Sequence, residues 1–187
     1  MRRFKPILLV VVAFALLANA STAQTKSPTK KTHVKVPKIA PRPEDVGSLD
    51  GIIAAFYDVI SGPAGKPRQW SRDRTLYISE IKFLEPRRSK GQITAMVMDH
   101  QTYVDKVNAP MVADGFFERE IHRVTQKFGN IVHVYSTYES RNSENGPVIA
   151  RGINSLELFN DGKRWWISFA QWDDEGPNNP IPKQFLP

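Results

Sequence analysis

Two carboxylates and one imidazole lie at alternate positions of a short segment that begins at Phe116. They are Glu118, Glu120 and His122. If residues 116–124 form a β-strand, side chains at two-residue spacing project from the same face. Such groups can act as a general acid and a general base, because each charge shifts the pKa of its neighbours. The same side chains also offer two oxygens and one nitrogen to a metal ion.

A structural role for these three residues is the alternative. Arg119 and Arg123 alternate with them, so both faces of a regular strand would carry charge. Cross-strand ion pairs account for such a pattern without catalysis. The sequence has no phosphate-binding loop, nucleophile elbow, dinucleotide fingerprint or zinc-ligand spacing. We therefore predict no metal and no cofactor, and we keep the three residues as catalytic candidates.

Another group of residues could line a ligand cavity. It consists of the aromatic side chains Tyr57, Trp70, Tyr103 and Trp165. Aromatic rings with polar tips suit a small apolar or aromatic ligand, because the ring buries apolar area while the tip makes a hydrogen bond. The alternative is that these rings simply fill the core.

Apolar spacing predicts the elements that must position these side chains. Apolar residues recur at three- and four-residue steps over residues 45–61, which predicts an amphipathic helix that Ser48 can cap. A short helical turn is expected over residues 69–76, and another helix between Asp99 and Gly115. Alternating patterns predict strands at residues 77–84, 92–98, 116–124, 130–140, 152–159 and 164–172. Helices followed by a run of antiparallel strands indicate the α+β class.

The last two predicted strands form the clearest hairpin. Asn160-Asp161-Gly162 separates them, and these residue types tolerate the positive φ of a tight turn. Strict alternation divides the side chains into two sets on opposite faces, Trp165, Ile167 and Phe169 on one and Trp166, Ala170 and Trp172 on the other. In the family that this hairpin resembles, described below, the Trp two residues before the Ile packs inward. That resemblance implies that the first set is in the core and that the second set faces outward. An outward aromatic strip predicts a homodimer formed through the sheet.

The N-terminal region has the composition of an export signal. Residues 1–23 contain basic residues, then an uncharged apolar run too short to span a bilayer, then small residues at Ala18-Asn19-Ala20. Residues 24–43 are rich in Thr, Pro and Lys, which predicts a basic, disordered linker. The folded domain is then expected over residues 44–187.

The positive net charge of +7 comes from this N-terminal region. Nine of the 26 basic residues, and none of the 19 acidic residues, lie before residue 44. The rest of the chain is slightly acidic, whereas a nucleic-acid-binding domain usually carries positive charge on a folded face. The chain has no cysteine, so no disulfide is available. We predict an exported protein, periplasmic or secreted, with no nucleic-acid partner and no stable membrane insertion after signal cleavage.

Several short motifs resemble the NTF2-like (SnoaL-like) superfamily. They are Gly115-Phe116-Phe117-Glu118 after the predicted third helix, Ser136 to Arg141, and Asp161-Gly162-Lys163-Arg164-Trp165-Trp166-Ile167 in the last hairpin. Together with the element order, these motifs extend the resemblance over residues 44–175. The chain is similar to an exported bacterial branch of that superfamily. It implies an α+β cone, in which about three N-terminal helices pack on a strongly curved antiparallel sheet around a cavity.

The resemblance implies two kinds of function, because this scaffold serves many unrelated ones. The first is a ligand-binding or interaction module of the bacterial cell envelope with a small apolar cavity. The alternative is a small cofactor-independent lyase or isomerase with acid–base residues in the cavity. Ketosteroid-isomerase relatives use a tyrosine with two acidic groups; Tyr57 is a candidate for the tyrosine, but no pair of acids matches the other positions. The absence of a recognisable catalytic set favours the first reading.

Overall fold

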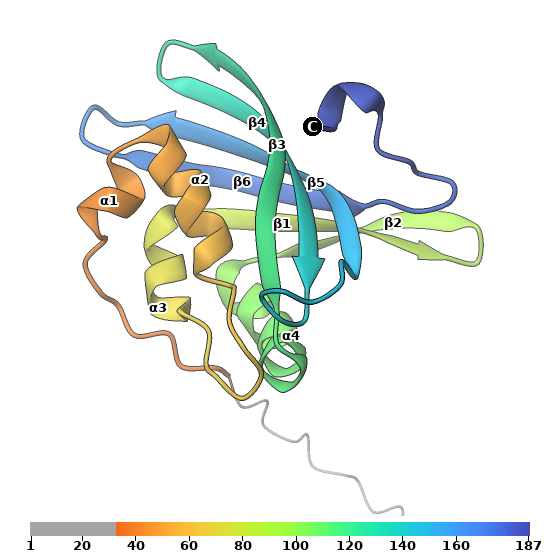
Figure 1. Cartoon of the computed structure of the whole chain (residues 1–187). Coiled ribbons are helices and arrows are strands. Elements are labelled where there is room, and N and C mark those ends of the chain that lie inside the picture. The colour runs from red at the N-terminus through yellow and green to blue at the C-terminus, as the bar shows by residue number, and fades with distance from the viewer. Residues whose placement is uncertain (1–32) are drawn as a thin grey trace, which may run out of the picture. The chain divides into compact units, whose positions relative to one another are not determined.

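A six-stranded sheet curves around a layer of helices (Figure 1). The computed structural model describes residues 33–187. The predicted signal peptide and the first part of the predicted linker therefore lie outside the described residues. None of the helices within residues 33–187 combines the length and the hydrophobicity that a membrane-spanning helix needs.

The helices lie close to their predicted positions. They are α1 (Pro43–Val46), α2 (Leu49–Asp58), α3 (Trp70–Asp73) and α4 (His100–Asp114), with 3₁₀ turns at Arg74–Leu76 and Lys183–Phe185. The single helix predicted over residues 45–61 is divided, because Ser48 has an extended backbone and its Oγ accepts a hydrogen bond from the Gly51 amide at 2.9 Å. Asp99 caps α4, and Gly115 follows its last residue, as predicted.

The sheet has the strand order β2-β1-β6-β5-β4-β3. The strands are β1 (Tyr77–Ser89), β2 (Gln92–Met98), β3 (Phe117–Phe128), β4 (Ile131–Arg141), β5 (Ala150–Asn160) and β6 (Trp165–Asp174). Neighbouring strands are antiparallel except β1 and β6, which run parallel. The α+β class is confirmed, and the expected antiparallel pairing holds for all but this one pair.

A β-bulge in β3 changes which face its side chains occupy. Glu120 pairs with Tyr138 of β4. The next paired residue, His122, lies opposite Thr137, so Ile121 is an extra residue. His122 therefore shares the face of Thr137, on the other side of the sheet from Glu120. The prediction that all three catalytic candidates lie on one face is wrong for His122.

A second bulge lies in β6. Ile167 pairs with Leu158 of β5. Phe169 pairs with Glu157, the residue directly before Leu158, which leaves Ser168 as the extra residue.

The bulge in β6 reverses the facing of the residues after it. Phe169 lies on the outer face beside the exposed Glu157. Ala170 is buried, and the Trp172 ring contacts Tyr103 of α4 with ring centroids 6.1 Å apart. The predictions of Phe169 in the core and of Ala170 and Trp172 on the outer face are therefore wrong. Residues before the bulge, such as Trp165, are buried as predicted.

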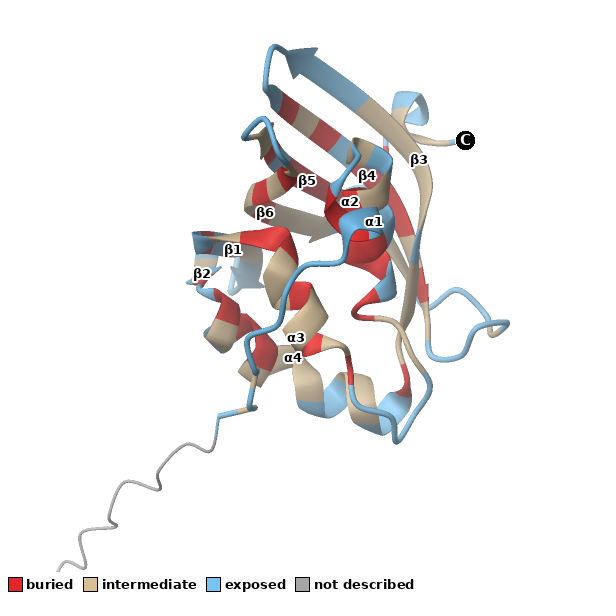
Figure 2. Ribbon diagram, turned by 90° about the vertical axis from the view of Figure 1, so that its left-hand side faces the viewer, coloured by how far each residue is buried: buried red, intermediate tan, exposed pale blue. Residues whose placement is uncertain are grey.

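The hydrophobic core lies between the helices and the inner face of the sheet (Figure 2). Helix α2 contacts β3 and β6, whereas α4 contacts β1 and β2. The buried side chains include Ile52, Ile53, Phe56, Val104, Val134, Leu156, Leu158 and Ile167. The two helices thus cover different parts of one face.

Segments without regular structure pack at both ends of the described chain. Near the N-terminal end, the Val34 amide donates to Asp105 of α4 at 2.8 Å. The C-terminal segment, residues 175–187, crosses the outer face of the sheet, where Thr137 Oγ donates to the Phe185 carbonyl at 2.6 Å. Ile181 of this segment is buried.

Candidate functional site

A cavity of about 320 Å³ lies between the helices and the inner face of the sheet. Its wall is largely apolar and consists mainly of Phe56, Ile60, Phe83, Tyr103, Val107, Met111, Phe116 and Trp172. Phe83 and Tyr103 are stacked with centroids 4.4 Å apart, and Trp172 meets Tyr103 edge-on. These contacts make an aromatic wall in a cavity whose volume suits a small molecule.

Polar side chains from neighbouring strands meet at one end of this cavity. They are Glu118 of β3, Tyr138 of β4, Asn154 of β5 and Asp174 of β6. The bulge in β6 lets Asp174 share the inner face with the others. The cavity therefore combines an aromatic body with one acidic, hydrogen-bonding end.

Glu118 contributes a carboxyl group with a strongly raised pKa to this cluster. Burial raises its pKa to about 8, and the nearby negative charge of Asp174 adds to this rise. Asn154 Nδ2 donates to Glu118 Oε1 at 3.2 Å, which opposes the rise by favouring the charged form. At neutral pH Glu118 is therefore mostly protonated, and its O–H can donate a hydrogen bond to a ligand.

Tyr138 and Asp174 form a hydrogen-bonded pair across β5. The Tyr138 hydroxyl donates to the Asp174 carboxylate, and burial is the main reason that the pKa of Tyr138 is raised. Gly152 lies between them on β5, where a Cβ atom would stand 2.4 Å from the Tyr138 oxygen. The missing side chain gives the tyrosine ring room to reach Asp174.

A hydrogen-bond network continues from Glu118 behind the cavity. Asn154 Nδ2 also donates to the Tyr57 oxygen at 3.2 Å, and that oxygen lies 2.6 Å from Ser136 Oγ. Ser136 in turn donates to the Glu120 carboxylate. Because each polar group has a partner, the network fixes the position of the Asn154 amide that contacts Glu118.

Glu120 is itself held by an ion pair. Arg123 Nη2 lies 2.7 Å from Glu120 Oε1, and Arg123 Nη1 lies 2.6 Å from the exposed Asp50 of α2. The bulge brings Arg123 to the face of Glu120, although regular alternation predicts the opposite face. Glu120 is thus paired within its own strand, whereas the predicted cross-strand pairing is found at Arg119 of β3 and Glu139 of β4.

The cavity is flanked by charged groups and by a second hollow. Lys106 of α4 pairs with Glu85 of β1, and desolvation lowers the pKa of Lys106. On the other side, Glu118 borders a polar hollow of about 570 Å³ that also contains Tyr57, Glu120 and three arginines. Glu118 is thus half-buried in a wall that two cavities share.

Two of the three predicted catalytic candidates lie close together, and the third does not. Glu118 lines the apolar cavity and also borders the polar hollow, which Glu120 lines as well. His122 lies on the outer face and cannot join them in a metal site. Within residues 33–187, no group of three or more His, Asp or Glu side chains is placed to hold a metal ion.

The predicted aromatic candidates also separate. Tyr103 lines the apolar cavity, and Tyr57 contributes its hydroxyl to the network behind it. Trp70 packs edge-on against Tyr103 but lines a different groove, next to the N-terminal segment. Trp165 is a core residue near Lys127. The core alternative is therefore the better description of Trp165.

Sequence reasoning missed most of the polar end of the cavity. Tyr138, Asn154 and Asp174 come from three different strands, and no local spacing connects them. Gly152 is the one residue whose type could have pointed to this part of the cavity, because a glycine inside a strand often marks a close approach of another group. It lies directly opposite Tyr138 in the sheet.

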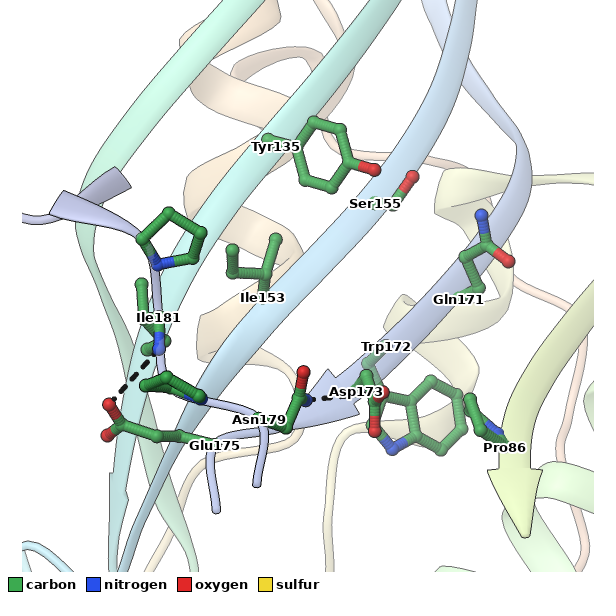
Figure 3. A pocket seen from close by; sticks show the side chains of 12 residues that line it. Pro86, Tyr135, Ile153, Ser155, Gln171, Trp172, Asp173, Glu175, Asn179 and Ile181 are labelled. Carbon is green, nitrogen blue, oxygen red and sulfur yellow. Dashed lines mark hydrogen bonds between the residues drawn. The ribbon is translucent and has the colours of Figure 1, made fainter. Parts of the chain in front are cut away.

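The outer face of the sheet carries a smaller hollow of about 210 Å³ (Figure 3). It lies between strand residues such as Tyr135 and Ile153 and the C-terminal segment around Ile181. The Ile181 amide donates to Glu175 at 3.3 Å, and Asn179 Nδ2 donates to the Asp174 carbonyl at 3.0 Å. The C-terminal segment thus occupies part of the surface on which the aromatic strip was predicted.

Solved structures with similar folds share little sequence with this chain. A protein of unknown function with a cystatin-like fold from Nostoc punctiforme PCC 73102 gives a TM-score of 0.50 at 9% identity, covering 66% of this chain and 86% of that chain. An NTF-2 like protein of unknown function from Silicibacter pomeroyi DSS-3 gives a TM-score of 0.46 at 11% identity, covering 69% of this chain and 94% of that chain. An NTF2-like protein of unknown function from Shewanella baltica OS155 gives a TM-score of 0.45 at 8% identity, covering 67% of this chain and 89% of that chain.

These likenesses concern the fold alone. No protein-family model and no curated protein matches this chain. The order of the elements, the six-stranded sheet and the helices on its inner face are those of an NTF2-like fold, and the prediction of that fold is confirmed.

Proposed function

We propose that the apolar cavity binds a small, largely apolar molecule that carries one oxygen able to accept a hydrogen bond, such as a carbonyl. The observation that carries this proposal is the raised pKa of Glu118, about 8, at the end of an aromatic cavity. A neutral carboxyl group donates a hydrogen bond without bringing a charge into an apolar site. The aromatic wall of Phe83, Tyr103 and Trp172 supports a flat or ring-shaped ligand body.

The proposed setting is the bacterial cell envelope or the extracellular space. The basic, apolar and small-residue order of residues 1–23 supports export. In this setting the protein acts as a binding or interaction module.

The experiment is a panel of aromatic ketones, phenols and aromatic acids, with tryptophan fluorescence as the readout. Trp172 lies in the cavity wall, so Trp172→Phe should remove the signal. Glu118→Gln retains an N–H donor and should bind close to the parent, whereas Glu118→Leu removes the donor and should weaken binding about tenfold. Glu144→Gln, an exposed change, is the matched control. Equal affinity of the Glu118→Leu variant and the parent would exclude the proposed role of Glu118.

One observation favours an enzyme as the second candidate. Glu118 is held protonated while Asp174 accepts a hydrogen bond from Tyr138, so a proton donor and a carboxylate base share one cavity. A lyase or isomerase could use Asp174 to remove a proton and Glu118 to stabilise the oxygen of the ligand. In that case Asp174→Asn should lower turnover of a bound ligand by about 10²- to 10⁴-fold. A ligand that binds but is not converted by the parent protein leaves the binding module as the function.

A further inference from the structure

Strand β2 is one free edge of the sheet. It pairs with β1 along one side, and no other strand within residues 33–187 pairs with its second side. In Figure 1 the β1–β2 hairpin extends away from the helices and the rest of the sheet. A two-stranded ribbon with little packing on either face is only marginally stable by itself. The free backbone groups of β2 are therefore available to another strand.

The free edge also carries an exposed apolar row. Ile93 is 70% exposed and Val97 is 57% exposed, and Ala95 between them is exposed as well. These residues share one face because they lie at two-residue spacing. Free edges are usually protected by lysine, proline or a bulge, and β2 itself has none of these. A strand of this kind is suited to pairing with another strand.

We propose that β2 pairs antiparallel with β2 of a second copy of this chain, with the two-fold axis at Ala95. In this register Ile93 of each copy lies opposite Val97 of the other, so the two exposed apolar side chains contact each other across the interface. The two sheets then form one continuous sheet. The proposal does not depend on the ligand of the cavity.

Charge at the two ends of β2 fits the same register. Lys90 and Asp99 are both exposed and stand at opposite ends of the strand. In this register Asp99 of one copy lies opposite Gly91 of the other, the residue next to Lys90, and the two Lys90 side chains stay far apart. The nearby cations Arg87 and Arg88 are already paired, with Glu85 and Asp173. The strand is thus complementary to itself in charge as well as in apolar side chains.

The outer face of the sheet is a poorer surface for the same contact. Residues 175–187 cross it, and Trp172, which was expected to form part of an aromatic strip there, contacts Tyr103 on the inner face. We therefore propose the edge of the sheet, and not its outer face, as the surface through which the predicted homodimer forms.

The test uses the absence of cysteine from the chain. Ala95→Cys places two thiols opposite each other at the axis, where paired Cα atoms are about 5 Å apart and within the reach of a disulfide. Ile93→Cys, alone, places them about 13 Å apart, which is too far. Under mild oxidation the Ala95→Cys protein should become a covalent dimer and the Ile93→Cys protein should not. An equal mixture of Ile93→Cys and Val97→Cys proteins should form a covalent heterodimer.

Sedimentation of the whole protein supplies the second readout. The parent should be a dimer, and Ile93→Lys should weaken dimerisation about tenfold or more, since it places a charge in the apolar row. Ile131→Lys is the matched control, because Ile131 is also exposed but lies in the β3–β4 hairpin. A monomeric parent, a dimer that fails to cross-link through Ala95→Cys, or a dimer broken by Ile131→Lys but not by Ile93→Lys would each overturn the proposal.

Discussion

Replacement of Glu118 by glutamine should remove a specific pH dependence of stability. The carboxyl pKa is about 8 in the folded protein and 4.5 without the fold. Between these pH values the folded state binds the extra proton, so the free energy of unfolding falls as pH rises through this range. Below pH 4.5 Glu118 is protonated in both the folded and the unfolded state, so no stability is lost through this group.

The size of the effect follows from the two pKa values. Moving a carboxyl pKa from 4.5 to about 8 corresponds to about 5 kcal/mol of stability lost by the upper pH. We take this as an upper limit, because Glu118 borders two cavities and its ionised form can gain contact with water. A loss on the order of 2–5 kcal/mol is large against the usual total stability of about 5–15 kcal/mol.

Urea unfolding of the parent and of Glu118→Gln, from about pH 5 to about pH 9, measures this loss. The amide has the size of the carboxyl group but does not titrate in this range, so the variant should lack this part of the slope. The difference between the two free energies should change in favour of the variant as pH rises. Glu144→Gln should follow the parent, because Glu144 is exposed. A difference that stays constant across the range would refute a raised pKa at Glu118.

Three further changes test other parts of the structure. Asp174→Asn removes the like charge that helps to raise the pKa of Glu118. The loss of stability with rising pH should therefore be centred at a lower pH than in the parent. An unchanged midpoint would show that Asp174 does not act on Glu118. Gly152→Ala places a methyl group 2.4 Å from the Tyr138 oxygen, so it should destabilise the protein by about 1–3 kcal/mol and displace the ring, measured by urea unfolding and crystallography. Ser48→Ala removes the cap of α2 and should cost about 1 kcal/mol in the same unfolding assay, with no change in the pH midpoint.

Local patterns in the sequence were sufficient to predict most elements. The spacing of apolar residues located α2 and α4, and cap residues such as Ser48 and Asp99 marked their starts. The Asn160-Asp161-Gly162 turn identified the β5–β6 hairpin. These signals depend on neighbouring residues only, so one sequence contains them in full.

The errors about which face a side chain occupies trace to the two β-bulges. Ile121 and Ser168 are ordinary strand residues, and nothing in their type marks them as extra residues in the ladder. Each one reverses the facing of every side chain that follows, which removed His122 from the predicted trio and brought Trp172 inward. The bulges are set by pairing between strands, which local spacing does not encode. For the same reason Asp174, which follows the second bulge, was not connected with Glu118.

The protonation state of Glu118 can be measured directly by an NMR titration of its side-chain carboxyl carbon in the ligand-free protein, with Glu118→Gln used to assign the signal. We expect this carbon to titrate with a midpoint near pH 8, so that the group is protonated at neutral pH and can donate a hydrogen bond in the cavity. A midpoint near the ordinary value of 4.5 would mean that the cavity contains a charged carboxylate at neutral pH, and it would contradict both the proposed ligand contact and the acid role of Glu118.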